Sequence, residues 1–314
     1  MSTFASLKTS TRRTMLKALL GAPVAAAALT SWRPGCAGAM EAADPASLGV
    51  MNFVVAGLDT RTPDEPENTD VLMVARVDLI NSSVRAFSIP RDLWVTIPGY
   101  GDEKITRAYD FGSKSAGGEF KAGAQAVADT IEYNFGIPID AAVMTTFQGF
   151  EQLVDAFGGV TVDNPYDVYD GEYPTYDYGY KEIYYPAGQV HLSGPEALEF
   201  CRTRHQDGDD GRSMRQRIVL RSLLDTARQS DSDTLQQLVL EHRSTIRTNL
   251  GRSKQLALAL AAPDFSNGNV EFATLQSYVF ASTAPTGAWI YAGDWSSIPG
   301  FTQSFLDGSI PGNA

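Results

Sequence analysis

The chain has few of the residues on which several common hydrolase classes depend. Its three histidines, at positions 191, 205 and 242, lack the spacing of metal-ligand motifs. It contains neither a G-x-x-x-x-G-K-[ST] phosphate loop nor a G-x-S-x-G nucleophile elbow. The sequence therefore argues against a zinc hydrolase and against a serine hydrolase.

Cysteine is scarcer still. The chain has two cysteines, Cys36 and Cys201. Cys36 lies in an N-terminal segment that we expect to be removed, which leaves Cys201 alone. We therefore expect no intramolecular disulfide in the mature protein, and cysteine usage does not identify its compartment.

Positive charge is also in short supply. The 25 lysines and arginines face 37 acidic residues, which gives a formal net charge of -12. Because the nucleic-acid backbone must be neutralised by many basic side chains, we expect no nucleic-acid partner. The composition is otherwise that of a globular protein, and 314 residues suffice for one large domain or two small ones.

The apolar run near the N-terminus, residues 18–32, is fifteen residues long, whereas a bilayer span needs about 20. Four basic residues and no acidic residue precede it within residues 1–17. Ala37-Gly38-Ala39 then supplies an A-x-A cleavage site. This order predicts an export signal over residues 1–39.

The paired Arg12-Arg13 makes this segment resemble a twin-arginine signal, which exports folded proteins. An uncleaved membrane anchor is the alternative. Lipid attachment at Cys36 is disfavoured because the preceding residues, Arg33-Pro34-Gly35, poorly match the sequence expected before a lipid-modified cysteine. In each case the working domain is expected outside the cytoplasm.

Local sequence patterns predict alternating strands and helices. Runs of β-branched and aromatic residues predict strands over residues 51–57, 71–77, 84–89, 141–146, 270–274 and 288–291. Helical spacing and cap signals predict helices over residues 117–135, 147–157, 193–201, 211–229, 231–247 and 252–262. The alternation implies an α/β sandwich around one central sheet. Residues 40–48 read as a linker, which leaves 49–314 as a single domain.

Tyrosine is concentrated in one stretch, with eight of the thirteen tyrosines between Tyr166 and Tyr185. Five acidic residues lie among them, including Asp167, Asp170, Glu172 and Asp177. We expect a long loop or excursion with its own side-chain packing. A flap held by tyrosine packing is the favoured role, and a surface on which sugars stack is the alternative.

Arginine is concentrated in another stretch, RTRHQDGDDGRSMRQRIVLR, at residues 202–221. It holds Arg202, Arg204, Arg212, Arg215, Arg217 and Arg221. A guanidinium group is always charged, and its planar fork of donors fits two phosphate oxygens at once. The concentration of arginines in one segment of an acidic protein therefore predicts a site for phosphate or pyrophosphate. A solvated helix face paired with the nearby aspartates is the alternative.

Two aspartates flank the turn between the first two predicted strands. Asp59 follows the first strand in Gly57-Leu58-Asp59-Thr60-Arg61, and Asp70 is expected immediately before the second. Ligands of α/β sheets bind beyond the carboxyl ends of strands. Mg²⁺ takes one or two protein carboxylates plus phosphate oxygens. The pair therefore predicts a Mg²⁺ site, with simple loop capping as the alternative.

Further charges follow the third predicted strand. We expect Arg91 to grip a phosphate group and Asp92 to orient that group or to pair with Arg91. Lys104 and Arg107 are spaced by one helical turn, which would put them on one face of a helix. Together these fragments supply the cations and carboxylates that pyrophosphate chemistry needs.

In order and spacing, these segments resemble the LytR–CpsA–Psr family. The resemblance rests on GLDTR, a T-D before a strand, SIPRDLWVTIPGYG, KITRAY, NFGIPID, FQGFEQLVDAFGGV, GQVHLSGPEALEFCRTR and DGDDGRSMRQR. It runs from about Met51 to Arg221 and more faintly to the end of the chain. Two motifs are specific for this family when they occur together. They are IPRD followed by IPGYG, and the arginine block that ends in GRxxRQR.

The resemblance implies a three-layer α/β/α sandwich with one central mixed sheet and a hydrophobic tunnel for a lipid. It implies an extracytoplasmic phosphotransferase that moves a glycopolymer from a polyprenyl-pyrophosphate carrier onto peptidoglycan through a phosphodiester. The polymer would be of teichoic acid, capsule or arabinogalactan type. The enzyme would work at the membrane surface or in the cell wall. A hydrolase of the same donor and a module that binds polyprenyl phosphate or glycan without turnover are the alternatives.

The resemblance also assigns roles by position. It makes Asp59 and Asp70 the carboxylates that hold Mg²⁺ or Mn²⁺. It assigns the pyrophosphate to Arg61, Arg91, Lys104, Arg202, Arg204 and Arg212, with Arg215 and Gln216 close behind. Asp59 or Asp92 would serve as the base toward the acceptor hydroxyl.

The chain departs from the family pattern at two positions near these residues. Asn68 stands where family members usually have arginine or lysine, and Thr106 stands where they usually have asparagine. We expect the loss of a cation near Asp70 to alter the affinity or specificity for the donor.

Overall fold

The structure is a computed structural model of the chain that describes residues 44–59, 67–175, 179–242, 245–265 and 269–313. The predicted export signal over residues 1–39 and the expected pyrophosphate ligand Arg61 lie outside these ranges. Within the described ranges, no helix has both the length and the apolar character needed to cross a membrane.

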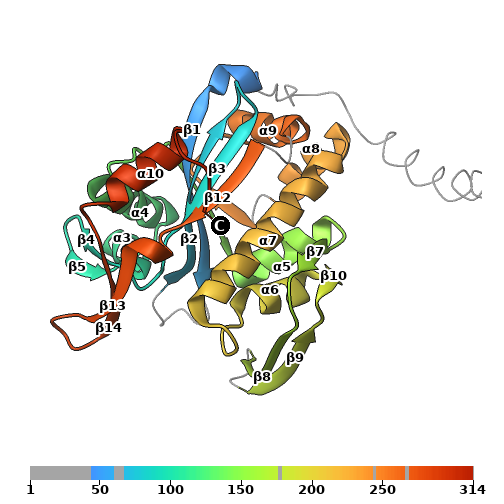
Figure 1. Cartoon of the computed structure of the whole chain (residues 1–314). Coiled ribbons are helices and arrows are strands. Elements are labelled where there is room, and N and C mark those ends of the chain that lie inside the picture. Colours follow the sequence, from blue (N-terminus) through green and yellow to red (C-terminus); the bar gives the residue numbers. More distant parts are fainter. Residues whose placement is uncertain (1–43, 60–66, 176–178, 243–244, 266–268, 314) are drawn as a thin grey trace, which may run out of the picture. The chain divides into compact units, whose positions relative to one another are not determined.

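A six-stranded mixed sheet forms the middle of the domain (Figure 1). Its strands are β1 (Val50–Asp59), β2 (Asn68–Asp78), β3 (Ser83–Ser88), β6 (Ala141–Thr146), β11 (Ile246–Thr248) and β12 (Val270–Thr274). Their order across the sheet is β11-β6-β1-β2-β3-β12. The β1–β6 and β3–β12 pairs are parallel, and the other neighbours are antiparallel. The expected central mixed sheet is therefore confirmed.

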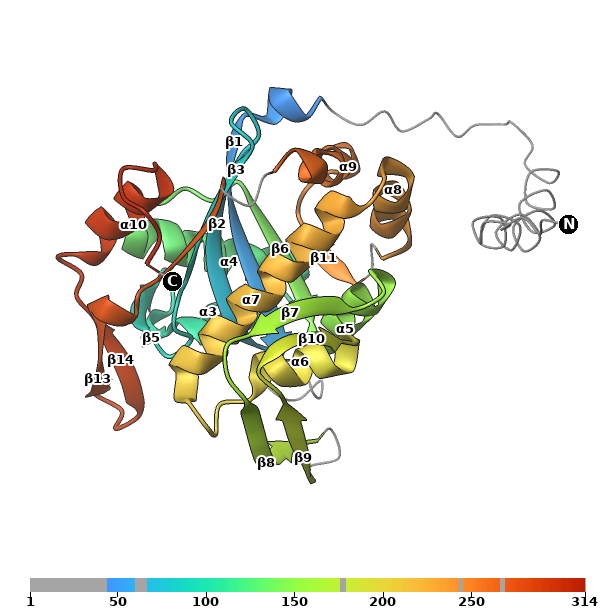
Figure 2. The same ribbon diagram turned by 45° about the vertical axis from the view of Figure 1, so that its right-hand side comes forward.

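Helices cover both faces of this sheet because its strands are apolar on both sides. Successive side chains of a strand point to opposite faces. Val54, Ala56 and Leu58 share a core cluster with residues of α4 (Phe120–Phe135) and α10 (Ile298–Leu306). Met51 and Phe53 share another cluster with residues of α7 (Gly208–Gln229) and α9 (Arg252–Ala261). Figures 1 and 2 show the resulting three layers.

The remaining helices extend these two layers. The helix α3 (Ala108–Ser115) packs on α4, and α5 (Phe147–Ala156) packs on α6 (Gly194–Arg202). The helix α8 (Ser232–Glu241) packs on α9. The capping box predicted at Ser193 is present and begins α6, since Ser193 and Glu196 bond each other's backbone N–H groups. The apolar stripe predicted for α4 is also buried, and Gly136 ends that helix with a left-handed φ of 69°.

Four two-stranded antiparallel pairs surround the main sheet. They are β4 (Trp94–Ile97) with β5 (Gly101–Lys104), β7 (Val160–Asn164) with β10 (Gly188–Leu192), β8 (Val168–Pro174) with β9 (Tyr180–Tyr185), and β13 (Val279–Thr283) with β14 (Trp289–Gly293). Figure 2 shows the β8–β9 hairpin projecting from the domain beneath α6.

The described part of the tyrosine-rich segment forms this β8–β9 hairpin, which is the excursion, rather than the long loop, of the two forms that we expected. Tyr173 and Tyr185 are buried, whereas Tyr169 and Tyr184 are exposed. Tyr184 and Tyr185 are neighbours on β9 and therefore point to opposite faces. On β8 the alternation breaks where the register shifts between Asp170 and Tyr173, so that Tyr169 and Tyr173 differ in burial. Tyr185 packs edge-on against Phe200 of α6 at a ring distance of 5.6 Å. The expected tyrosine packing is confirmed for the buried pair.

Three local predictions are wrong, each because tertiary contacts override the local pattern. The predicted helix over 231–247 ends at Glu241, and residues 246–248 add the edge strand β11 to β6. Lys104 ends strand β5 and Arg107 lies in a 3₁₀ turn, so they do not share a helix face. The predicted linker over 40–48 ends in a 3₁₀ turn at Pro45–Leu48, where Leu48 packs on the core.

Candidate active site

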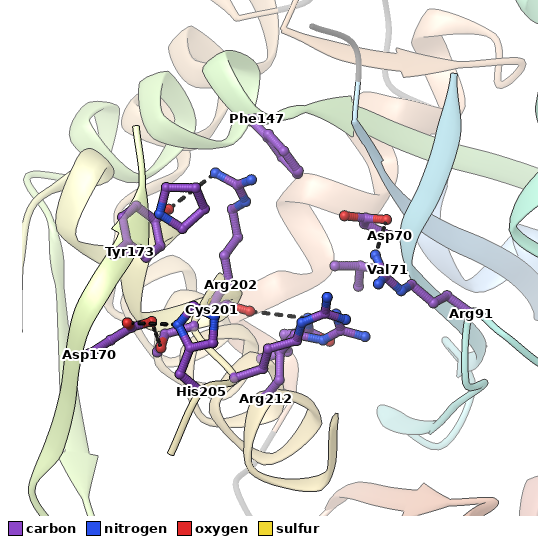
Figure 3. A pocket seen from close by; sticks show the side chains of 14 residues that line it. Asp70, Val71, Arg91, Phe147, Asp170, Tyr173, Cys201, Arg202, His205 and Arg212 are labelled. Carbon is purple, nitrogen blue, oxygen red and sulfur yellow. Dashed lines mark hydrogen bonds and ion pairs between the residues drawn. The ribbon is translucent and has the colours of Figure 1, made fainter. Parts of the chain in front are cut away.

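A polar cavity of about 160 Å³ lies where β2 and β3 face the connection between α6 and α7. Figure 3 shows Asp70 and Arg91 on the sheet side of this cavity, with Arg202, His205 and Arg212 on the helix side. We call it the arginine pocket. Its lining consists of Asp70, Val71, Arg91, Phe147, Asp170, Tyr173, Pro174, Cys201, Arg202, Thr203, Arg204, His205, Arg212 and Gln216. Most of the arginines predicted to hold a pyrophosphate thus line one cavity.

Arg202 is the last residue of α6, and aromatic rings hold its side chain across the pocket. Its guanidinium lies over the Phe147 ring at 4.3 Å and over the Tyr173 ring at 5.7 Å. Its Nη1 donates a hydrogen bond of 3.1 Å to the hydroxyl of Tyr173. Burial raises the pKa of Tyr173 to about 12, although Arg202 lowers it, so the hydroxyl stays protonated at neutral pH. Cation–π contacts thus orient Arg202 while most of its donors remain available to an anion.

Arg212 presents a buried guanidinium to the same pocket from the second turn of α7. The residue is only 7% exposed, and its Nη2 lies 3.3 Å from Oδ1 of Asp209. Its Nε is buried without a hydrogen-bond partner. Burial lowers the pKa of Arg212, and nearby Arg91 adds to this effect against the attraction of Asp209. An anion in the pocket would supply the missing acceptor and offset this repulsion.

Arg91 lies opposite, directly after β3. Its Nη1 donates to Oδ1 of Asp70 at 2.7 Å, and its Nε lies 3.4 Å from Oδ2 of Asp92. Burial lowers the pKa of Arg91, but the stronger combined effect of Asp70 and Asp92 raises it overall. Arg91 is therefore a fixed cation whose Nε, like that of Arg212, has no hydrogen-bond acceptor.

Asp70 lies inside β2 rather than immediately before it, because the strand begins at Asn68. It is the extra residue of a β-bulge, since Gly57 pairs with Val71 and Leu58 pairs with Thr69. Bulges commonly re-aim side chains beside functional sites. Here the bulge brings the carboxylate of Asp70 into the arginine pocket.

Asp59 ends β1 at the same end of this ladder, where it pairs with Asn68. It does not line the arginine pocket. Of the two predicted metal-binding carboxylates, Asp70 therefore lies in the bulge and Asp59 lies on the neighbouring strand beside it. Among the described residues, no group of three or more histidine, cysteine and acidic side chains is arranged to hold a metal ion.

Asp92 and Lys104 lie behind Arg91 and outside the pocket lining. The Nζ of Lys104 donates to Oδ1 of Asp92 at 2.7 Å. The predictions that Lys104 contacts the pyrophosphate and that Asp92 is the base stay predictions, since the structure shows the two side chains bonded to each other outside the pocket lining. Asp92 pairs with both Arg91 and Lys104, and this arrangement suits a role in holding the side chain of Arg91 in place.

Arg215 also lies behind the pocket, where it is fully buried. Its Nε donates to the carbonyl oxygen of Phe200 at 2.9 Å, and its Nη2 donates to Oδ1 of Asp207 at 3.0 Å. Its other hydrogen bonds go to Asp207 Oδ2 and to the carbonyl oxygen of Thr203. Arg215 therefore fixes the end of α6 and the connection that follows it, next to Arg202 and Arg204, and does not line the pocket.

Gly211 makes room for this buried pair. A Cβ atom at this position would overlap the carboxyl group of Asp207. The glycine of the GRxxRQR block is thus required by the packing of Asp207 against Arg215. Gln216 lines the arginine pocket and donates from Nε2 to the carbonyl oxygen of Cys201 at 3.2 Å.

Arg204 is the most exposed of the pocket arginines. Its side chain is 51% exposed and lies 4.0 Å from Oδ1 of Asp209. Because a loose ion pair at the surface contributes little stability, Arg204 is free to turn toward a ligand at the pocket mouth.

The two departures from the family pattern have structural partners. The Nη1 of Arg107 donates to Oδ1 of Asn68 at 3.3 Å, so a cation still lies beside the position where family members usually have one. The hydroxyl of Thr106 donates to the carbonyl oxygen of Thr69 at 3.0 Å. Thr106 thus ties the 3₁₀ turn to the strand that carries Asp70.

An apolar cavity of about 100 Å³ adjoins the arginine pocket between the sheet and α5, α6 and α7. Five residues line both cavities: Val71, Phe147, Cys201, Arg202 and Gln216. The remaining wall consists of Val55, Ala56, Gly57, Thr145, Thr146, Phe150, Leu198, Val219 and Leu220. A cavity of roughly 150 Å³ holds a benzene molecule. The space therefore fits only part of a long lipid unless α5, α6 and α7 move apart.

Several lining residues were not predicted from the sequence. Phe147 and Tyr173 belong to segments read only as a helix and as a tyrosine-rich excursion. Asp170 and His205 form a hydrogen-bonded pair of 2.8 Å, although 35 positions separate them in the chain. The one available signal was that His205 lies inside the arginine block.

Known proteins share both the sequence and the fold. TagU of Halalkalibacterium halodurans, a polyisoprenyl-teichoic acid–peptidoglycan teichoic acid transferase, is 36% identical over 216 residues, which is 67% of this chain and 63% of TagU. The chain thus matches less than two thirds of that relative's length. The crystal structure of B. subtilis TagV has a TM-score of 0.67 at 25% identity, covering 82% of this chain and 98% of TagV. The structure of TagT bound to LI-WTA has a TM-score of 0.61 at 25% identity, covering 84% and 93% of the two chains.

The LytR_cpsA_psr family model matches residues 36–304, which include every segment that builds the arginine pocket. The protein therefore belongs to the LytR_cpsA_psr family.

Proposed function

We propose that this protein is an extracytoplasmic phosphotransferase that moves a glycopolymer from a polyprenyl-pyrophosphate carrier onto peptidoglycan through a phosphodiester bond. The observation that carries the proposal is the shared wall between the arginine pocket and the apolar cavity. One side offers several guanidinium groups and the other offers only apolar surface. A ligand with a polyanionic head and an apolar tail matches this pair of spaces.

The arginines supply the electrostatic part of the reaction. Phosphoryl transfer depends mainly on positioning and on stabilising charge. Arg91 and Arg212 each keep a buried Nε without an acceptor, and Arg202 is oriented by aromatic rings. These three side chains would hold the diphosphate and stabilise the polyprenyl phosphate as it leaves.

Asp59 and Asp70 fit the donor set that Mg²⁺ or Mn²⁺ uses beside phosphates. Mg²⁺ usually takes one or two carboxylates and completes its shell with waters and phosphate oxygens. One oxygen of Asp70 bonds Arg91, and the carboxylate has a second oxygen to offer a cation. When bound, the metal ion would neutralise negative charge on the phosphates.

The relatives support the proposed substrates. TagU and TagV are named as transferases of teichoic acid from a polyisoprenyl carrier to peptidoglycan. A donor on such a carrier would reach the pocket from the membrane surface, and the acceptor would lie outside the cytoplasm. The export signal predicted over residues 1–39 agrees with this location.

The test combines the purified protein with Mg²⁺, a polyprenyl-pyrophosphate-linked saccharide and a peptidoglycan oligosaccharide, with products read by mass spectrometry. We expect a phosphodiester-linked adduct from the wild type and none from the Arg202→Ala or Arg212→Ala variants. Hydrolysed donor without adduct would instead identify a hydrolase. Bound lipid without turnover would identify a binding module.

A further inference from the structure

The arginine pocket contains a histidine–aspartate pair that the proposed function has not used. His205 lies in the connection between α6 and α7, and its Nδ1 is 2.8 Å from Oδ1 of Asp170 on β8. The side chain of Asp170 is 1% exposed, whereas that of His205 is 55% exposed. Figure 3 shows this contact at the helix side of the pocket.

Asp170 is held as a carboxylate that only accepts hydrogen bonds. Its Oδ2 accepts from the hydroxyl of Thr203 at 2.6 Å, and its Oδ1 also accepts from the backbone N–H of Glu172 at 3.0 Å. Burial raises the pKa of Asp170, but the bonds from Thr203, His205 and Glu172 lower it more, so the pKa lies below its usual range.

This partner fixes the tautomer of the imidazole. An ionised carboxylate carries no proton, so Nδ1 of His205 must donate to it. In the neutral ring, Nε2 is then the unprotonated nitrogen. The ring lines the arginine pocket, where an Nε2 lone pair can accept a proton.

The other titratable groups of the pocket are already committed. Asp70 bonds Arg91 at 2.7 Å. Tyr173 is a protonated donor at neutral pH because burial raises its pKa to about 12. Burial likewise raises the pKa of Cys201 to about 12, against the effect of Arg215. Among the described residues that line this pocket, His205 is thus the group whose geometry best suits it to accept a proton, because Asp170 fixes its tautomer.

The position of the pair suits the acceptor side of the reaction. Neither Asp170 nor His205 lines the apolar cavity, which adjoins the pocket through residues such as Phe147 and Cys201. A donor whose lipid occupies that cavity would direct its glycan, and the approaching hydroxyl, toward the remaining polar end. The charged groups that line the pocket with His205 are Asp70, Arg91, Asp170, Arg202, Arg204 and Arg212. Asp209 lies 3.3 Å from Nη2 of Arg212 and outside the lining.

We propose that His205, oriented by Asp170, accepts the proton of the acceptor hydroxyl during transfer; the inference rests on the proposed function. The acceptor oxygen forms a bond to phosphorus while the bond from that phosphorus to the bridging oxygen breaks. The polyprenyl monophosphate leaves with the electron pair. The proton passes to Nε2 of His205 and then to solvent. Asp170 is a positioning residue, since it acts through the imidazole.

The test measures kcat and donor affinity between pH 5 and 9 for the full chain and for His205→Gln, His205→Lys and Asp170→Asn. For the wild type we expect kcat to rise with pH as the imidazole loses its proton. His205→Gln should lower kcat by about 10²-fold or more and abolish that rise, with donor affinity nearly unchanged. Asp170→Asn should shift the rise to lower pH, because the carboxylate favours the imidazolium.

The lysine variant separates proton transfer from simple charge. His205→Lys keeps a cation in the pocket but carries no proton acceptor at neutral pH, so it should be as slow as His205→Gln. His191→Gln, on β10 outside the pocket, is the matched control and should behave as the wild type. Melting temperatures would show that each variant is folded.

Two results would overturn the inference while leaving the proposed function intact. One is an active wild type with an unchanged pH profile in His205→Gln. The other is full activity in His205→Lys, which would make the residue a phosphate-binding cation. A wild type that forms no adduct would overturn the proposed function itself, and this inference with it.

Discussion

Arg91 donates from Nη1 to Oδ1 of Asp70 at 2.7 Å, which joins the end of β3 to the bulge of β2. The same carboxylate is thus both the anchor of a pocket arginine and a proposed ligand of the metal ion. This relationship makes Asp70 the residue at which the metal proposal is most directly tested.

We expect Asp70→Asn to raise the Mg²⁺ concentration needed for half-maximal transfer by at least about tenfold, since even outer-shell partners of metal ligands contribute that much. Asp59→Ala should have the same effect. The measurement is the transfer rate as a function of Mg²⁺. Asp163→Asn on the exposed side of β7 is the matched control. An unchanged metal curve in either site variant would remove that residue from the metal site.

Arg212→Lys should lower transfer by about 10²- to 10³-fold, because an ammonium group cannot replace the planar fork of donors. Stability should not fall, since the native Nε is buried without an acceptor. Arg217→Lys makes the same change on the same helix outside the pocket and should keep its activity. Transfer rates and melting temperatures of both variants check the prediction, and equal activity would contradict it.

Val55→Phe should narrow the apolar cavity, because Val55 of β1 lines it. We expect weaker use of long polyprenyl donors with little change for a donor that carries a short isoprenoid. Steady-state kinetics with the two donors measure the difference. Val50→Phe lies on the same strand at a position that is 48% exposed, and it serves as the control. An equal loss for both donors would argue that the lipid lies elsewhere.

Gly211→Ala should destabilise the fold by about 3 kcal/mol, because the added methyl group displaces Asp207 from the buried Arg215. Gly300→Ala in α10 meets no neighbouring atom and should stabilise by about 0.5–1 kcal/mol. Denaturant unfolding of the two variants tests the contrast. Equal stabilities would show that Asp207 relaxes without loss.

The stability of the domain should fall in acid through Asp170 and Asp207. Burial raises the pKa of Asp207, but bonds from Arg215 and Tyr166 lower it more, and Asp170 behaves in the same way. A carboxyl group whose pKa is lower in the folded state than in the unfolded chain stabilises the folded state. This stabilisation is complete at pH values above the pKa of the unfolded chain, which is about 4. That contribution is lost as the pH falls through the folded pKa.

Melting temperatures measured from pH 7 down to pH 2 test this expectation. Asp207→Asn should lower the melting temperature at pH 7 and flatten its decline below about pH 4. Asp163→Asn makes the same change on exposed β7 and should leave the curve as it is. A variant Asp207→Asn curve that runs parallel to the wild type would contradict the assignment.

Local sequence patterns predicted helices α4 to α9 and every strand of the main sheet except β11, but not α3, α10 or most strands of the two-stranded pairs. Strand β6 and strand β12 were predicted with the bounds that the structure has, because short β-branched runs between turn formers have few alternatives. The end of the predicted helix over 231–247 was wrong because strand β11 forms only by pairing with β6. Pairing partners of an edge strand are remote in the chain, so no local pattern contains them.

In the arginine block, too, the local sequence predicted one part of the site and tertiary packing decided the other. Its sequence predicted a phosphate pocket, and Arg202, Arg204 and Arg212 do line one cavity. Whether each arginine faces that cavity depends on packing. Arg215 is turned inward by Asp207, and Lys104 is held by Asp92.

The sequence by itself determined the alternation of strands and helices, the concentration of arginine in an acidic chain and the resemblance to a family, because each is written in neighbouring residues. Only the tertiary structure decided which charges share a cavity, that Asp70 occupies a bulge and that Asp170 orients His205. These facts depend on side chains from distant segments meeting at hydrogen-bond distance. Such meetings are fixed by the packing of the whole domain.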